Sequence, residues 1–300
     1  MKNHLNSLRS VRPLRTGMLF GVFALIGTFL APVAAAKIHL KISACAEAVD
    51  AFDNWTAATP WAQITNFKNA NAARPAVDLL LELQALKAGG LDFDFELVRK
   101  LTYEQAKVEV IEGRAELTAE TIWGDEIAEH ANVLLKTDEI IRNGEFVKGI
   151  YVLSTNEKLL KLASLEELRD SVGAVVATWA LDVKTLESLK LKGLKKVVKL
   201  DLVFSAIQKQ QADFTLGEFA PTPDKGAVSG GAKFVPVPNC TVAIMGSRSW
   251  IVAKASPNAD AILSALAAGV KILRDNGTIE RAYQESGFFN PRIAGWKRLY

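Results

Sequence analysis

The apolar residues of this chain follow the two-residue period of strands in some segments and the three-to-four-residue period of helices in others. Residues 37–43 alternate polar and apolar side chains and predict a first strand. Residues 44–73 keep neither period, and we expect irregular structure there. A helix is predicted from Pro75 to the glycine pair at 89–90, because proline suits a first helical turn and glycine suits a helix end.

The rest of the first half completes an α/β unit, with a strand at 92–98, a helix at 102–112 and a strand at 115–121. The second half alternates in the same way, with strands at 149–154, 172–177, 196–200, 213–216 and 234–237, and helices at 182–190 and 201–210. Ser164 and Glu167 have the spacing of a helix capping box. The repeated order predicts an α/β fold with two lobes, each a mostly parallel sheet flanked by helices.

The stretch at 249–289 has a distinct layout. A short apolar strand at 250–253 precedes Ser256 and Pro257, which are suited to begin a helix. That helix has one apolar stripe, formed by Ile262, Leu266, Val270 and Leu273. The pair at 276–277 ends it, and Thr278 is placed to cap a second helix that ends at Gly287.

This order of strand, K-x-S-P, long helix, D-N-G-T-I and helix resembles the end of family 3 extracellular solute-binding proteins. These are two-lobed periplasmic receptors that usually work with ABC transporters. The resemblance implies a type II periplasmic-binding-protein fold, in which this stretch returns from the second lobe to the first. It implies a first lobe at 37–147 and 252–300, a second lobe at 148–251, and two hinge crossings. The alternative is two sequential α/β domains without a return.

Residues 1–36 are typical of an export leader. Four basic residues come first, an apolar run at 17–30 follows, and Ala34–Ala36 offers a small-residue cleavage site. We expect cleavage near Ala36 and a periplasmic location; the alternative is an uncleaved membrane anchor. Removal of the leader leaves 32 of the 36 basic residues against 33 acidic ones, a net charge of −1. This balance gives no reason to expect nucleic-acid binding.

The sequence motifs of several other functional classes are absent. The histidines at positions 39 and 130 have no ligand-type spacing, so we expect no metal, and no motif indicates a cofactor. No nucleophile elbow or phosphate-binding loop is present. Cys45 and Cys240 are far apart in sequence, and we favour two separate buried thiols over a disulfide. We expect a monomer.

Candidate ligand residues follow the strands, because ligands bind beyond the carboxyl ends of parallel strands. They are Glu47, Thr121, Trp123, Asp125, Thr178, Trp179, Glu218 and Phe219. The two tryptophans suit an aromatic sandwich around a ligand, or alternatively core packing. The carboxylates suit a cation, or alternatively helix starts; for Asp182, at the start of a helix, the structural role is favoured.

Amino-acid receptors of the family carry a T-x-T-x-x-R segment whose arginine clamps the ligand carboxylate by a forked hydrogen bond. Here the segment reads T-I-W-G-D-E at 121–126 and ends in Glu126. The family's second-lobe acidic residue, which holds the ligand amine, corresponds loosely to Glu218. Half of the amino-acid device is therefore missing, and the aromatic and acidic lining favours a cationic or neutral small molecule.

Three functions fit these observations. The first is a non-enzymatic periplasmic receptor that captures a small solute by hinge closure and passes it to an importer or a membrane sensor. The second is a dehydratase-like enzyme on the same fold, with Glu218 or Glu47 as an acid–base group of raised pKa. The third is an interaction module that signals to a membrane partner. We favour the receptor, because no paired catalytic constellation stands out.

Overall fold

The first sheet has five strands in the order β2-β1-β3-β13-β5. The computed structural model describes residues 37–219 and 224–300, so the leader predicted at 1–36 lies outside the described residues. β1 pairs in parallel with β2 and β3, whereas β13 is antiparallel to β3 and β5. The strands are β1 (Ile38–Cys45), β2 (Phe93–Lys100), β3 (Leu117–Thr118), β5 (Leu134–Lys136) and β13 (Ile251–Ala253).

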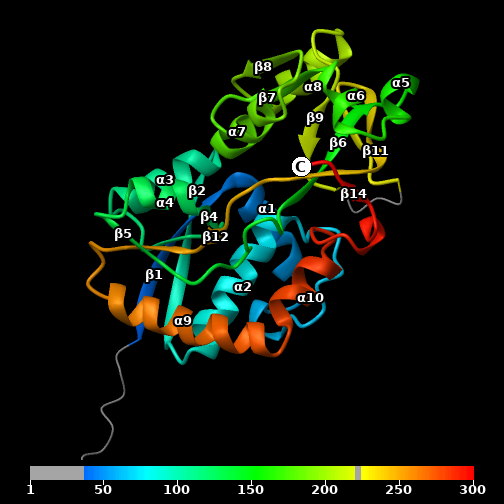
Figure 1. Cartoon of the computed structure of the whole chain (residues 1–300). Coiled ribbons are helices and arrows are strands. Elements are labelled where there is room, and N and C mark those ends of the chain that lie inside the picture. The colour runs from blue at the N-terminus through cyan, green and yellow to red at the C-terminus, as the bar shows by residue number, and fades with distance from the viewer. Residues whose placement is uncertain (1–36, 220–223) are drawn as a thin grey trace, which may run out of the picture. The chain divides into compact units, whose positions relative to one another are not determined.

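Helices from both ends of the described chain pack in this region, and α9 and α10 lie beside α2 (Figure 1). The helices are α1 (Ala46–Thr56), α2 (Arg74–Ala88), α3 (Tyr103–Ile111), α4 (Gly124–Glu129), α9 (Ala259–Asp275) and α10 (Thr278–Glu285), with a short turn η1 (Trp61–Gln63). A small two-stranded ribbon joins β4 (Ile122–Trp123) to β12 (Arg248–Ser249).

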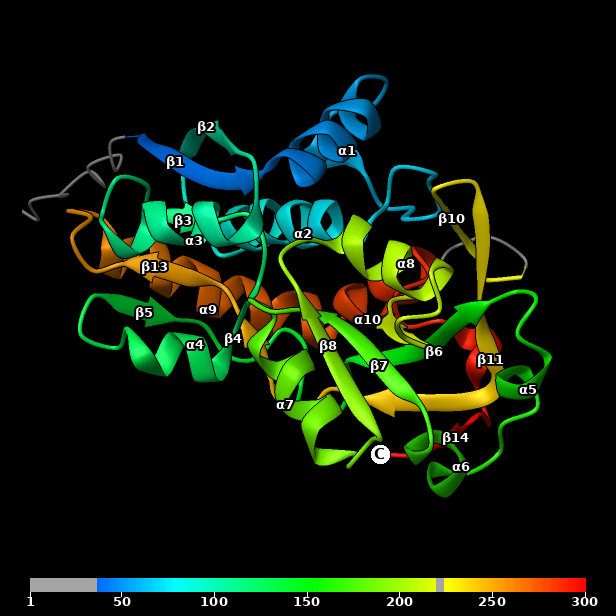
Figure 2. The ribbon, with the colours of Figure 1, turned by 90° about the horizontal axis from the view of Figure 1, so that it is seen from above.

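The second sheet has the order β10-β11-β6-β9, and a single bridge from Gly173 to Phe214 connects it to the parallel pair β7–β8. Figure 2 shows β7 and β8 side by side, near α7 and α8. The strands are β6 (Val147–Leu153), β7 (Val172–Val176), β8 (Gly193–Val197), β9 (Thr215–Gly217), β10 (Ala227–Ser229), β11 (Ala232–Ala243) and β14 (Lys297–Arg298). The helices are α5 (Glu157–Leu160), α6 (Leu165–Arg169), α7 (Ala180–Ser188), α8 (Leu200–Gln208) and the turn η2 (Pro291–Ile293).

The chain passes between the two sheets three times. It leaves the first sheet after β5 to form β6, and it returns after β11 to form β12 and β13. These two passages are the ones that the sequence predicts. A third follows α10, because β14 pairs in parallel with β11 at Cys240 and Thr241. The C-terminal residues therefore add a strand to the second sheet.

Four sequence predictions about local structure are wrong. Thr278 does not cap α10, because it is the first residue of that helix and Gly277 stands at the cap. The segment predicted to be irregular contains α1, which buries Ala48, Val49, Phe52 and Trp55 at helical spacing but has no side-chain cap to mark its start. α9 begins at Ala259 rather than at Pro257, because the Ser256 hydroxyl accepts a bond from the Asn258 amide in a turn before the helix. The sheets are mixed rather than mostly parallel, because the long strands β6 and β11 pair antiparallel.

The two cysteines are free and buried, as the favoured prediction has it. Cys45 ends β1 in the first sheet and Cys240 lies on β11 in the second, so they belong to separate parts of the core. Among the described residues, no helix is long and apolar enough to cross a bilayer.

A close contact between α2 and α9 is made at two glycines, Gly89 just after α2 and Gly269 within α9. A Cβ on Gly269 would lie 1.8 Å from the carbonyl oxygen of Ala85, and one on Gly89 would lie 1.9 Å from that of Ala265. Only a residue without a side chain allows the two helix backbones to meet at this distance. Residues 36–300 form one compact unit, and this contact ties its C-terminal helices to α2.

Replacing Gly269 by alanine should lower the melting temperature of residues 37–300, measured by calorimetry. Alanine normally favours a helix over glycine by about 1 kcal/mol. Here the added Cβ, 1.8 Å from the Ala85 oxygen, forces the helices apart, and overpacking of this kind costs about 1–3 kcal/mol. Gly193→Ala is the control, because its Cβ would meet Val172 at 3.4 Å, an ordinary contact. An unchanged melting temperature for Gly269→Ala would contradict the close packing.

Candidate functional site

A fully buried carboxylate, that of Asp78 on α2, collects four hydrogen bonds. Its Oδ2 accepts from Arg74 Nη1 at 2.9 Å, from the Thr121 hydroxyl at 2.9 Å and from the Thr121 amide at 3.0 Å. Its Oδ1 accepts from the Tyr283 hydroxyl at 2.6 Å. A buried carboxylate is stable only when its oxygens are satisfied in this way. Asp78 therefore fixes Arg74 and Thr121, the residue that precedes β4.

A buried arginine, Arg248, reaches the same threonine from β12. β12 pairs antiparallel with β4, which sets Arg248 opposite Trp123. Arg248 is 3% exposed, its Nε donates to the Thr121 hydroxyl at 3.0 Å, and its Nη2 donates to the Thr121 carbonyl. The guanidinium carbon lies 4.5 Å from the Trp123 ring centre. Among the described residues, no carboxylate forms an ion pair with Arg248, so its charge is buried without a direct counter-ion.

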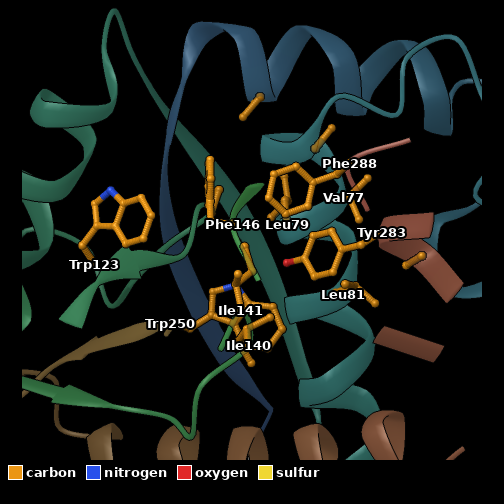
Figure 3. Packing of buried hydrophobic residues seen from close by; sticks show 14 of the residues in the cluster. Val77, Leu79, Leu81, Trp123, Ile140, Ile141, Phe146, Trp250, Tyr283 and Phe288 are labelled. Atoms are coloured by element: carbon orange, nitrogen blue, oxygen red, sulfur yellow. The ribbon is translucent and has the colours of Figure 1, made fainter. Parts of the chain in front are cut away.

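A row of aromatic rings lines this region. Figure 3 shows Phe146 between Trp123 and Phe288, and the ring centres are 5.0 Å and 4.9 Å apart. Tyr283 continues the row, 5.3 Å from Phe288. Such spacing is typical of attractive aromatic pairs. The rings thus form an apolar wall beside the polar network of Asp78.

Three basic side chains converge on the Phe146 ring. Arg74, Lys148 and Arg248 lie 5.7, 5.3 and 5.7 Å from its centre. Arg74 and Lys148 each have an acidic partner as well, whereas Arg248 relies on Thr121 and on aromatic faces. Cations over aromatic rings are stabilised by the ring quadrupole, but only in part. The three cations are matched in number by the carboxylates of Asp78, Asp182 and Glu218, but none of these carboxylates forms a direct ion pair with Arg248.

Glu218 closes this cluster from the second sheet. Its Oε1 accepts from Arg74 Nε at 3.1 Å, and its side chain is 37% exposed. Burial raises the pKa of this carboxyl, but the charges of Arg74, Lys148 and Arg248 outweigh that effect and leave the pKa below its ordinary value. Glu218 is thus an ionised carboxylate held among cations. Nearby, Lys148 donates to the buried Asp182 at 2.5 Å.

Four of the sequence-predicted residues meet here. Thr121, Trp123 and Glu218 belong to the cluster just described, and the Trp179 ring lies 5.2 Å from Lys148. Among the described ring contacts, Trp123 packs on Phe146 and none joins the two tryptophans, so their sandwich around a ligand stays a prediction.

The other predicted residues lie elsewhere. Glu47 is exposed in the first turn of α1, which agrees with the alternative prediction of a carboxylate at a helix start. Phe219 is 5% exposed and packs on Tyr151 and Trp296, with ring centres at 6.5 Å and 5.8 Å. Its neighbours are therefore the buried Tyr151 of the second sheet and the half-buried Trp296 of the C-terminal segment.

Asp125 and Thr178 make contacts between elements of the two sheets. Asp125, at the start of α4, accepts from Lys184 of α7 at 3.5 Å. Thr178, after β7, donates to Glu104 of α3 at 3.3 Å. Both contacts are solvent-exposed, so each contributes little to stability. They mark where the two sheets' helices approach each other.

Sequence reasoning missed Arg74, Asp78, Phe146, Lys148 and Arg248. Two signals were present. Arg74 and Asp78 stand four residues apart on a helix that is otherwise almost wholly apolar, which places charged groups on its buried side. Arg248 lies next to the buried Trp250 in an apolar segment. The spatial pairing of β12 with β4, which brings Arg248 to Thr121, has no local signal.

Glu126 stands at the position where the T-x-T-x-x-R segment of amino-acid receptors has its arginine. Two side chains donate hydrogen bonds to the Glu126 carboxylate. It accepts from Lys107 at 2.6 Å and from the Tyr103 hydroxyl at 3.2 Å. Tyr103 in turn lies 5.6 Å from the guanidinium of Arg248. The expected arginine is therefore absent from the segment at 121–126, but Arg248 from another strand contacts the same threonine.

A second buried carboxylate, that of Glu82, lies on α2. Neither oxygen of Glu82 has a hydrogen-bond partner among the described residues. Burial, followed by the charges of Asp78 and Glu120, raises the pKa of Glu82 well above its ordinary value. Burial, then Glu120, raises the pKa of the Cys45 thiol to about 12, which makes it unreactive.

The described residues hold no group of His, Cys, Asp and Glu side chains arranged to bind a metal ion. Two open surface hollows in the described part of the chain lie outside the cluster around Arg248. One is lined by Lys100, Glu104, Gln105, Val108 and Glu109, and the other by Lys158, Leu159, Lys161, Leu162 and Glu167.

The arrangement of two α/β lobes, with β13 returning to the first sheet, is the two-lobed type II fold of periplasmic binding proteins. Solved structures show the likeness. The probable amino-acid ABC transporter extracellular-binding protein ytmK of Bacillus subtilis has a TM-score of 0.56 and 14% identity, with 83% of this chain and 97% of that chain covered.

Two further structures are similar. An ancestral arginine-binding protein bound to arginine has a TM-score of 0.50 and 15% identity, with 84% of this chain and 98% of that chain covered. The BvgS VFT2 domain of Bordetella pertussis has a TM-score of 0.50 and 12% identity, with 86% and 93% covered. No protein-family model matches this chain, and no curated protein matches it. At these identities the likeness concerns the fold.

Replacing Glu82 by glutamine should raise stability at neutral pH relative to the native chain. Glu82 keeps its proton in the fold, because its pKa is raised, whereas the unfolded chain releases it above pH 4.5. The free energy of unfolding therefore falls as pH rises above 4.5, by at most about 1.4 kcal/mol per pH unit. Glutamine does not titrate, so the Glu82→Gln chain lacks this fall in the free energy of unfolding. Urea unfolding of both chains at several pH values between 4.5 and 7 measures the difference, and a difference that does not grow with pH would contradict a protonated Glu82.

Proposed function

We propose that this protein is a non-enzymatic receptor that binds a small molecule carrying a carboxylate or a similar planar anion between its two lobes. One observation carries the proposal: Arg248 is a buried guanidinium that no carboxylate of the described residues neutralises. Two of its N–H groups are held by Thr121, which fixes its plane. The remaining donors suit the two oxygens of a ligand carboxylate, because the guanidinium fork matches that geometry.

The ligand proposed here carries an anionic group, whereas the sequence alone favours a cationic or neutral small molecule. Arg74, Lys148 and Arg248 all approach Phe146, and the charge of Glu218 is already shared among them. The Trp123 and Phe146 rings would bury the apolar part of the ligand. The names of two similar structures agree with a carboxylate ligand, because one is a probable amino-acid binding protein and another is bound to arginine.

Ligand entry would require the lobes to separate, because the Arg74–Glu218 ion pair occupies the space between the sheets. We place the first lobe at 37–147 and 252–300, except for β14, which pairs with the second sheet, and the second lobe at 148–251, with bending near the passages that join β5 to β6 and β11 to β12. Closure would then restore contacts such as Thr178 to Glu104 and Asp125 to Lys184. A ligand that touches both lobes stabilises the closed arrangement by its extra contacts.

The enzymatic alternative needs a carboxylate with a raised pKa that faces the ligand. Glu82 has a raised pKa but is fully buried. The pKa of Glu218 is lowered, so this residue is a poor general acid. We therefore retain the receptor, exported through the leader, monomeric and without a cofactor, with an ABC-type permease or a membrane sensor as its partner.

Arg248→Lys should weaken binding of the ligand about 10- to 100-fold, because lysine keeps the charge but loses the forked pair of hydrogen bonds. A thermal-shift screen of residues 37–300 against amino acids, dicarboxylates, sugars and amines identifies the ligand. Calorimetry then compares the native chain, Arg248→Lys and, as a control, Arg281→Lys, an exposed arginine on α10. The proposal also predicts that the methyl ester of the ligand binds weakly.

The outcome that would overturn this proposal is a ligand without an anionic group, or one whose affinity is the same for the native chain and for Arg248→Lys. The melting temperature of each free variant is measured in the same series, so that a loss of folding is not read as a loss of binding.

A further inference from the structure

The most basic segment of the described chain lies far from Arg248 in sequence, at the edge of the second sheet. Five lysines occur between residues 190 and 199, and Asp201 is the one acidic residue between 190 and 202. They are Lys190, Lys192, Lys195, Lys196 and Lys199. The concentration is local, because the chain without its leader has a net charge of −1. We call residues 190–202 the lysine segment.

Most of this charge is not neutralised by neighbours. Lys196 donates to Glu187 of α7 at 2.7 Å. The other four lysines form no ion pair or side-chain hydrogen bond with any described residue, and three of the four, Lys190, Lys192 and Lys199, are exposed. An anion that approached this edge would therefore meet several uncompensated positive charges at once.

Exposed aliphatic side chains lie within the same segment. Val198 is 80% exposed, and Leu200 and Leu202, at the start of α8, are 43% and 40% exposed. Val228 on β10, an element that packs against α8, is 75% exposed. These four account for nearly half of the nine large exposed apolar residues in the described part of the chain. Apolar side chains gathered on one surface indicate an interaction site more strongly than scattered ones do.

Protection of a sheet edge explains only part of this pattern. β8 pairs with β7 alone, so it is an edge strand, and lysines on edge strands prevent pairing with other chains. That role covers Lys195 and Lys196, which lie within β8. It does not cover the lysines at 190, 192 and 199, which lie outside the strand, and it gives no reason to expose Val198 and Leu200.

We propose that the lysine segment docks on an anionic phospholipid surface. Lysines among exposed aliphatic side chains are the composition of interfacial membrane-binding elements, in which the cations meet lipid phosphates and the apolar groups enter the acyl boundary. A purely acidic protein surface would match the lysines but would leave Val198 and Leu200 without apolar partners. The proposal is independent of the ligand site and concerns how the receptor is held near a membrane.

The first experiment is co-sedimentation of residues 37–300 with vesicles of phosphatidylcholine, with and without phosphatidylglycerol. We expect pelleting only with the anionic vesicles, and a loss of pelleting as salt is raised. Each lysine near such a surface contributes roughly fivefold to partitioning. The variant with Lys192, Lys195 and Lys199 all changed to glutamine should therefore partition on the order of 100-fold less.

The matched control changes Lys68, Lys136 and Lys161 to glutamine, which removes the same charge from exposed positions outside the segment. Circular dichroism verifies that both variants are folded. If the control loses as much partitioning as the segment variant, net charge alone explains the binding and the proposal fails. Absence of pelleting with phosphatidylglycerol vesicles also overturns it.

A second experiment separates a lipid surface from an acidic protein. Val198→Cys carries an environment-sensitive fluorophore, because Cys45 and Cys240 are buried and label poorly. The emission should shift to the blue with anionic vesicles, and the same label at Thr155→Cys, an exposed position in the loop before α5, should not respond. An unchanged Val198 label on pelleted protein, or equally tight binding to polyglutamate, would favour an acidic protein partner and reject the lipid surface.

Discussion

The buried carboxylate of Asp78 is the interaction on which the rest of the site depends. An ionised carboxylate in an apolar interior must be fully hydrogen-bonded. Asp78 meets this requirement with donors from α2, from the residue before β4 and from α10, segments that lie more than two hundred residues apart at the extremes. Loss of any one of these donors would leave the buried Asp78 carboxylate with an unsatisfied oxygen. The hydrogen bonds therefore hold the three segments in one geometry. Thr121 in particular is held where it meets Arg248.

The charges around Phe146 form an incomplete set of pairs. Arg74 is shared between Asp78 and Glu218, and Lys148 is paired with Asp182. Arg248 has aromatic faces and a threonine instead of a carboxylate. Burying a charge without a counter-ion is costly, and a cation over an aromatic ring recovers about 0.5–2 kcal/mol. An incoming anion would give Arg248 the direct ion pair that it lacks, which is the physical reason to propose ligand binding at this place.

Much of the fold follows from local patterns, because period, capping and glycine positions are local properties. α2 ends before Gly89, and α3 lies within the helix predicted at 102–112. α1 was missed because it has no cap, and the antiparallel partners of β6 were missed because strand pairing is a long-range property. The site was predicted in part: Thr121 and Trp123 follow a strand, whereas the location of Arg248 depends on the pairing of β12 with β4.

Arg248 shows that a guanidinium can come from a strand outside the sequence motif that would be expected to supply it. The segment at 121–126 ends in Glu126, which binds Lys107 and Tyr103 and has no role toward a ligand carboxylate. Because β12 lies against β4, a guanidinium from the returning chain occupies the neighbourhood that a motif arginine would serve. Under the proposed function this shift has a consequence. The anion would be held by a residue next to the passage between the lobes, so the contact that binds the ligand would also brace the segment about which the lobes move.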